Sequence, residues 1–88
     1  MKYAYIIYNS ITFASRVKRE AARSFCWCSM LQTPGEISTN GCSYSVRCKA
    51  EDVSRVVAIS ARLNIQIKGI YLGRQEQGRV TYEPYDLS

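Results

Sequence analysis

Hydrophobic and polar residues alternate with two different periods along this chain, and each change of period marks a structural element. Residues 3–8 (YAYIIY) are dense in aromatic and β-branched side chains, which is typical of a buried strand. Asn9-Ser10 then supplies a stop and a helix N-cap. The apolar positions from Ile11 to Arg23 follow helical spacing: Phe13, Ala14, Val17 and Ala21. A strand followed by a first helix is predicted.

Two further runs alternate with a period of two and are separated by a break at Thr33-Pro34-Gly35. In residues 25–31, one face carries Cys26, Cys28 and Met30, and the other carries Trp27, Ser29 and Leu31. In residues 42–48, one face carries Cys42, Tyr44, Val46 and Cys48. These patterns predict two strands joined by a loop.

The pairing of these two strands depends on how the loop closes. Opposing Gln32 to Cys42 gives an antiparallel register with these pairs: Met30–Tyr44, Cys28–Val46 and Cys26–Cys48. A slip of two residues would instead oppose Cys28 and Cys48 while leaving every side chain on the same face.

A second helix and more strands follow. Glu51 and Asp52 suit a helix N-terminus, and Asn64 ends a stripe of core positions made of Val53, Val56, Val57, Ser60 and Leu63. Residues 65–71 alternate as a fourth strand, with Ile70 on the face away from the helices. A turn signal at Gln77-Gly78 precedes residues 79–82, which we expect to add a short fifth strand.

The order β-α-β-β-α-β predicts an α+β fold, namely a ferredoxin-like βαββαβ sandwich with a four-stranded antiparallel sheet and two helices on one face. A short extra C-terminal strand can extend this sheet. At 88 residues the chain has room for one small domain. We place that domain at residues 1–72 and a C-terminal hairpin or tail at residues 73–88.

Charge narrows the classes of partner. The chain has 12 Lys+Arg against 7 Asp+Glu, a net charge of +5. Arg16, Arg19 and Arg23 share one face of the first helix, but Glu20 interrupts them, so a solvated face is favoured over a phosphate-binding stripe. Residues 42–48 also lack the aromatic signature of RNA-recognition modules, and a nucleic-acid partner is not expected.

Cellular location follows from what the sequence lacks. It shows neither a secretory signal nor an apolar stretch of membrane-spanning length, so we expect no membrane association and a cytoplasmic protein. The four cysteines should then be free thiols, because structural disulfides are rare in a reducing compartment.

Three of the four cysteines have a simple structural interpretation. Cys26 and Cys28 are two apart in a predicted strand, so their side chains point the same way about 7 Å apart and do not suit a disulfide. The chain has no histidine, and the spacing fits no common zinc motif. We therefore expect neither metal nor cofactor, and we interpret Cys26, Cys28 and Cys48 as small buried apolar groups.

Cys42 differs because it lies where a turn-rich loop meets a strand. Asn40-Gly41 can form an anion-accepting nest of backbone N–H groups there, and Arg47 and Lys49 downstream favour negative charge. A thiolate at Cys42 could hold sulfur or selenium as a persulfide or selenopersulfide. Without a histidine to act as base, cysteine hydrolase chemistry is disfavoured. An inert, buried Cys42 is the alternative. The loop residues expected to shape access are Pro34, Glu36, Ser38, Asn40 and Gly41.

The sheet face away from the helices suggests a second class of function. Trp27, Leu31 and Ile70 are the apolar residues expected on that face. An uncovered patch around a tryptophan is typical of a partner surface, so a homodimer or another protein could pack there. The chain would then be an interaction or regulatory module, and Cys42 would be incidental.

Several of these features, in this order, resemble the Putative Se/S carrier protein-like family of small bacterial proteins over about residues 3–71. They are the opening strand with its polar turn, the charged first helix, the Pro34–Ser38 loop, Cys42, Arg47 and Gly69-Ile70-Tyr71. The chain differs from the family pattern at Gly35, where arginine is usual, and at Ser43, where glycine follows the cysteine. The resemblance implies a non-enzymatic carrier with Cys42 as the chalcogen-bearing residue and a sulfur or selenium donor or acceptor protein as partner.

Overall fold

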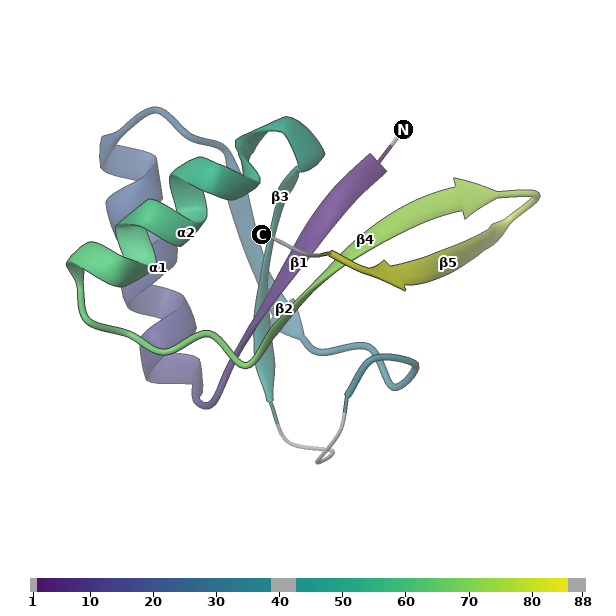
Figure 1. The fold of residues 1–88 in the computed structure, drawn as a ribbon, viewed down its shortest axis with the longest axis horizontal. Helices are drawn as coiled ribbons and strands as arrows, with labels where there is room; N and C mark the ends of the chain where they lie inside the picture. Colours follow the sequence, from purple (N-terminus) through teal and green to yellow (C-terminus); the bar gives the residue numbers. More distant parts are fainter. Residues whose placement is uncertain (1, 39–42, 86–88) are drawn as a thin grey trace.

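The computed structural model describes residues 2–38 and 43–85. Within them the chain forms an α+β fold with one antiparallel sheet in the order β2-β3-β1-β4-β5 and two helices (Figure 1). The elements are β1 (Lys2–Tyr8), α1 (Ile11–Arg23), β2 (Cys28–Gln32), β3 (Tyr44–Lys49), a 3-10 turn (Ala50–Asp52), α2 (Val53–Arg62), β4 (Gly69–Glu76) and β5 (Arg79–Pro84).

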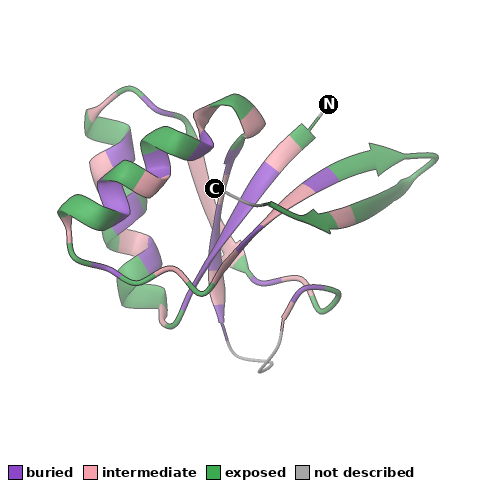
Figure 2. Ribbon diagram, in the orientation of Figure 1, coloured by how far each residue is buried: buried purple, intermediate pink, exposed green. Residues whose placement is uncertain are grey.

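Both helices pack on one side of the sheet, which we call the helix face (Figures 1 and 2). Its buried residues come from both helices and the central strands: Ala14, Val17 and Ala21 of α1, Val53, Val56 and Ile59 of α2, and Ala4, Ile6, Tyr8, Val46 and Cys48 of the sheet. The Tyr8 hydroxyl lies 2.6 Å from Oγ of Ser60, which itself donates to the Val56 carbonyl at 3.0 Å. This pairing satisfies the buried hydroxyls between β1 and α2.

Helix α1 confirms its predicted bounds and its cap. Oγ of Ser10 accepts a hydrogen bond from the N–H of Phe13 at 3.3 Å, which satisfies one of the free donors of the first turn. At the other end, the N–H of Cys26 donates to the Ala21 carbonyl at 2.9 Å, and Phe25 takes a positive φ of 57°. This is the Schellman arrangement, which usually has glycine at the left-handed position.

That helix end corrects the predicted strand over residues 25–31. Because Phe25 and Cys26 complete the C-cap of α1, pairing begins only at Cys28. Helix α2 ends in the same way at Asn64, with φ of 59°, and confirms the predicted stop there.

The register of β2 on β3 follows the alternative with a slip of two residues. Cys28 lies opposite Cys48, Met30 opposite Val46 and Gln32 opposite Tyr44, so the register based on Gln32 and Cys42 is wrong. The pairing extends further than that register assumes, since the Thr33 N–H donates to the Ser43 carbonyl at 3.0 Å. Pro34 lacks an N–H to continue this ladder.

The predicted fourth strand is shifted in sequence. Residues 65–68 lie outside the strand, although Ile65 and Ile67 still pack against the core, and β4 begins at Gly69. The alternation restarts there, so Ile70 points to the helix face and is 8% exposed, while Tyr71 points to the opposite face. The placement of Ile70 on the uncovered face is therefore wrong.

The fifth strand confirms the C-terminal prediction. β4 and β5 pair from Tyr71–Pro84 to Glu76–Arg79, and Gln77 and Gly78 close the hairpin with φ of 50° and 78°. Two positive φ values are typical of the tight turns that match the twist of a hairpin. In Figure 1 this hairpin projects away from the helices.

Candidate functional site

The loop after β2 contains the turn that the sequence predicts. It also covers part of the sheet. The N–H of Ile37 donates to the Pro34 carbonyl at 3.0 Å, which closes a turn over Pro34, Gly35 and Glu36. Ile37 is 5% exposed and packs on Tyr5 and Ile7. We call this side of the sheet the loop face (Figure 1). The second face, predicted to be open, is therefore covered in part by this loop.

This role of Ile37 was not predicted from the sequence. It is the only aliphatic residue between Thr33 and Gly41, and such an isolated apolar position in a polar loop is the signal that could have indicated an anchor. The loop is fixed at its start as well, because Oγ1 of Thr33 lies 2.7 Å from Oγ of the buried Ser45. The start of the loop is thus attached to β3.

Of the residues proposed to shape access to the Cys42 thiol, some are described by the structure and others are not. Pro34 and Glu36 lie in the anchored turn and Ser38 follows it; Pro34 and Ser38 are half-buried and Glu36 is exposed. Asn40, Gly41 and Cys42 lie outside the described residues, so their roles stay predictions. Among the residues that are described, Oγ of Ser43 is buried without a hydrogen-bond partner.

Arg47 lies on the loop face and is held by two aromatic rings. Its guanidinium carbon is 4.9 Å from the ring centroid of Tyr3 and 5.6 Å from that of Trp27, and these two rings are 5.9 Å apart. Such contacts are cation–π interactions. Within residues 2–38 and 43–85, Nε of Arg47 is buried without a hydrogen-bond partner.

Arg47 and Lys49, which are predicted to favour the Cys42 thiolate, lie towards the end of β3 that is far from Ser43. Arg47 lies about 13 Å along the strand from Ser43, and Lys49 is further along still. Lys49 lines a surface pocket with Tyr3 and Trp27. The structure therefore brings both cations to the aromatic pair, and their action on Cys42 stays a prediction.

The other three cysteines cluster on the helix face, where all are free thiols. Cys48 is fully buried, Cys26 is 3% exposed and Cys28 is half-buried. Cys26 precedes β2 and completes the C-cap of α1, so the expectation that Cys26 and Cys28 belong to one strand is wrong. The interpretation as buried apolar groups holds for Cys26 and Cys48.

Burial raises the pKa of two of these thiols. The pKa of Cys48 is raised to about 12, chiefly because burial disfavours the thiolate, with Cys26 and the Asp52 carboxylate adding to the rise. The pKa of Cys28 is also raised to about 12, first by burial and then by Cys26 and Cys48. Both thiols are protonated at neutral pH and are therefore weak nucleophiles. No group of three or more metal-ligating side chains occurs among the described residues.

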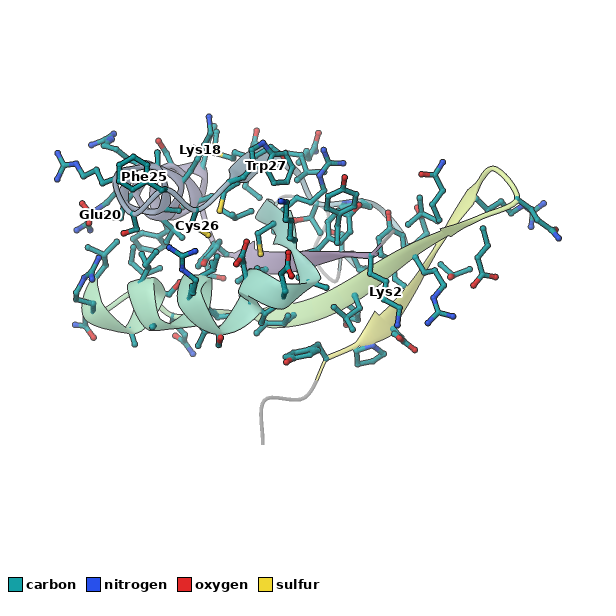
Figure 3. All side chains as sticks on the ribbon, turned by 90° about the horizontal axis from the view of Figure 1, so that it is seen from above. Lys2, Lys18, Glu20, Phe25, Cys26 and Trp27 are labelled. Carbon is teal, nitrogen blue, oxygen red and sulfur yellow. The ribbon has the colours of Figure 1, made fainter. Side chains whose placement is uncertain are left out.

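Two of the residues predicted for an interface, Trp27 and Leu31, differ in how far they are exposed. Trp27 is 46% exposed, as an interface requires, whereas Leu31 is half-buried against the cluster of Tyr5, Ile7 and Ile37. Phe25, which was not predicted as an interface residue, is 95% exposed at the end of α1. In Figure 3, Phe25 and Trp27 lie on either side of Lys18, with Cys26 beneath them.

Comparison with known proteins identifies the family of this chain. The family described as Putative Se/S carrier protein-like matches residues 2–72, which is most of the chain. The chain belongs to this family. The match runs from β1 into β4 and includes the anchored loop and the thiol cluster of the Se/S carrier-like domain. No curated protein and no solved structure matches. Within the described part of the chain, neither helix is long and apolar enough to cross a membrane.

Proposed function

We propose that this protein is a non-enzymatic carrier of sulfur or selenium, with the chalcogen held on Cys42. The observation that carries the proposal is that the three described cysteines do not suit a carrier. Burial raises the pKa of Cys28 and Cys48 to about 12, and Cys26 is enclosed in the core. A chalcogen carrier needs a thiol that ionises near neutral pH and reaches solvent. Membership of the Se/S carrier-like family supports this function.

The loop and the two cations complete the proposal. The anchored turn of Pro34 and Glu36, with Ser38, Asn40 and Gly41, would shape access to Cys42, and Arg47 and Lys49 would favour the thiolate through their positive charge. A donor or acceptor protein in the cytoplasm would exchange the chalcogen. The strand order β2-β3-β1-β4 and the two helices on one face also support a ferredoxin-like architecture.

Persulfide trapping tests the proposal directly. The reduced protein is incubated with inorganic polysulfide, alkylated, digested and analysed by mass spectrometry. We expect one added sulfur atom on Cys42. A Cys42→Ser variant should lose this label, and the matched Cys28→Ser variant should keep it. Persulfide on Cys28 in the unsubstituted protein, or none on any cysteine, would contradict the proposal.

A second candidate function rests on the exposed aromatic residues. Phe25 and Trp27 are 95% and 46% exposed, which favours an interaction module that dimerises or binds a protein partner. Trp27→Glu should then lower the oligomeric mass measured by light scattering, while Cys42→Ser should leave it unchanged. A monomeric mass for the unsubstituted protein and for both variants would contradict dimerisation.

A further inference from the structure

Two free thiols lie directly opposite each other on neighbouring strands. Cys28 of β2 is paired with Cys48 of β3, and both side chains point to the helix face. Opposed residues of an antiparallel pair have Cα atoms about 4.5 to 5.5 Å apart. A disulfide needs Cα atoms about 4.4 to 6.8 Å apart. The register alone therefore sets these two cysteines at bonding range.

The third thiol of the cluster is less well placed for a stable bridge. Cys26 lines the same pocket as Cys28, but the two residues are separated by Trp27 alone and Cys26 is part of the α1 C-cap. A bridge between them would close a ring of only three residues and pull Cys26 away from Ala21. Cys28–Cys48 is the pair that the sheet holds in position.

A surface pocket gives access to one thiol of this pair. The pocket has a volume of about 350 Å³ and is lined by Lys18, Ala22, Phe25, Cys26, Trp27 and Cys28. Cys28 is half-buried at this pocket, whereas Cys48 is fully buried. Figure 3 shows Lys18 at the same surface, between the two aromatic side chains. Its ammonium favours an anionic reagent.

The backbone conformation of Phe25 indicates that the lining of this pocket is not selected for stability alone. A bulky residue with φ of 57° bears a backbone cost that glycine would avoid, and a side chain that is 95% exposed recovers little by packing. Strained residues often accompany a site that uses them. Here the residue with the positive φ lines the same pocket as Cys28.

We propose that Cys28 and Cys48 form a redox-active dithiol, which reduces a small anionic disulfide entering the pocket between Phe25 and Trp27. The Cys28 thiolate attacks one sulfur of the reagent, breaking its S–S bond and releasing one thiol. The Cys48 thiolate then attacks the Cys28 sulfur, forming the Cys28–Cys48 disulfide and releasing the second thiol. The two protons lost by the cysteines go to the two leaving thiolates, so that one dithiol and one disulfide exchange two electrons.

The surroundings of the pair predict the direction of this exchange. The groups that face it are Cys26, Asp52, Tyr8 and, at the pocket, Lys18. Burial and the Asp52 carboxylate oppose the thiolates, so the reduced form gains little from ionisation. Pairs whose reduced form is stabilised are oxidants, and this pair should therefore act as an electron donor. Reaction should be slow at neutral pH and should accelerate about tenfold per pH unit below the thiol pKa.

Oxidised glutathione serves as the anionic probe in a full-length Cys42→Ser background. This background removes the proposed carrier cysteine, so this experiment and persulfide trapping can fail independently. We expect peptide mapping to show a Cys28–Cys48 disulfide and release of two glutathione molecules for each protein. The single tryptophan, Trp27, adjoins Cys28 and should report the reaction by a change in fluorescence.

Two matched variants distinguish the pair from the rest of the cluster. Cys48→Ala should stop the reaction at a mixed disulfide of glutathione with Cys28, and Cys26→Ala should still form the Cys28–Cys48 bridge. A Cys26–Cys28 bridge, a bridge between two protein molecules, or no oxidation at alkaline pH would each overturn the proposal.

Discussion

The two faces of the sheet differ sharply in chemistry although the same strands build both. On the helix face, Cys48 is fully buried and its thiol is kept protonated. On the loop face, its neighbour Arg47 lies over Tyr3 and beside Trp27. Cys48 and Arg47 are adjacent in the sequence, but successive side chains of a strand point to opposite faces. A single step along β3 thus separates the cation from the thiol that it could otherwise ionise.

This separation shows why proximity in sequence is a poor guide to a thiolate site. A positive residue one position away from a cysteine in a strand points to the opposite face of the sheet, whereas a residue two positions away shares its face. The pKa of the Cys48 thiol is raised by burial, by Cys26 and by the Asp52 carboxylate, and none of these favours the thiolate. Carrier chemistry on this protein therefore needs a thiol other than Cys28 and Cys48.

The largest effect should come from placing a charge on the helix face. Cys48→Asp buries an unpaired carboxylate beside Asp52, and we expect the free energy of unfolding to fall by about 3 kcal/mol or more. Ser29→Asp is the matched control, because Ser29 lies opposite Arg47 on the loop face. It should change stability by less than about 0.5 kcal/mol. Equal losses for the two variants in urea denaturation would refute the difference between the faces.

A smaller effect is expected from crowding the loop face. A Cβ added at Gly73 would lie 2.6 Å from the Tyr5 ring, which packs edge-on against Tyr82 at 5.3 Å. Gly73→Ala should destabilise the protein by about 1 to 3 kcal/mol, since the ring must move. Gly35→Ala serves as the control because a Cβ there meets nothing within 4 Å. Thermal unfolding that ranks Gly35→Ala as the more damaging change would contradict this packing.

The smallest effect is a gain in stability at the end of α1. Phe25→Gly removes a bulky side chain from a left-handed position and should stabilise the fold by about 0.5 to 1 kcal/mol. Phe25→Ala keeps a Cβ at the same φ and should give little of this gain. Urea denaturation compares the two variants. A Phe25→Gly variant that is less stable than Phe25→Ala would contradict this account of the helix end.

Much of this architecture could be predicted because local signals agreed with the packing. Ser10 and the apolar spacing defined α1, and Gln77-Gly78 defined the last hairpin. The start of β4 could not be predicted, because Ile65 and Ile67 continue the alternation although they precede the strand. The β2–β3 register depends on a hydrogen bond from Thr33 to Ser43, which no periodicity reveals.

The candidate site was harder to predict than the fold. The faces of Cys28 and Cys48 followed from alternation, but their direct opposition depended on that same register. Ile37 was missed because a loop residue has no periodic pattern to indicate burial. Phe25 was missed because a left-handed aromatic residue violates the usual preference for glycine at a helix end.

The most direct test of this account is the rate of alkylation of each cysteine by iodoacetamide, measured by mass spectrometry as a function of pH. We expect Cys42 to react first at neutral pH. The Cys28 rate should rise about tenfold per pH unit towards its pKa of about 12, and buried Cys26 and Cys48 should stay unmodified in the folded protein. Alkylation of Cys28 or Cys48 at neutral pH as fast as that of Cys42 would contradict the account.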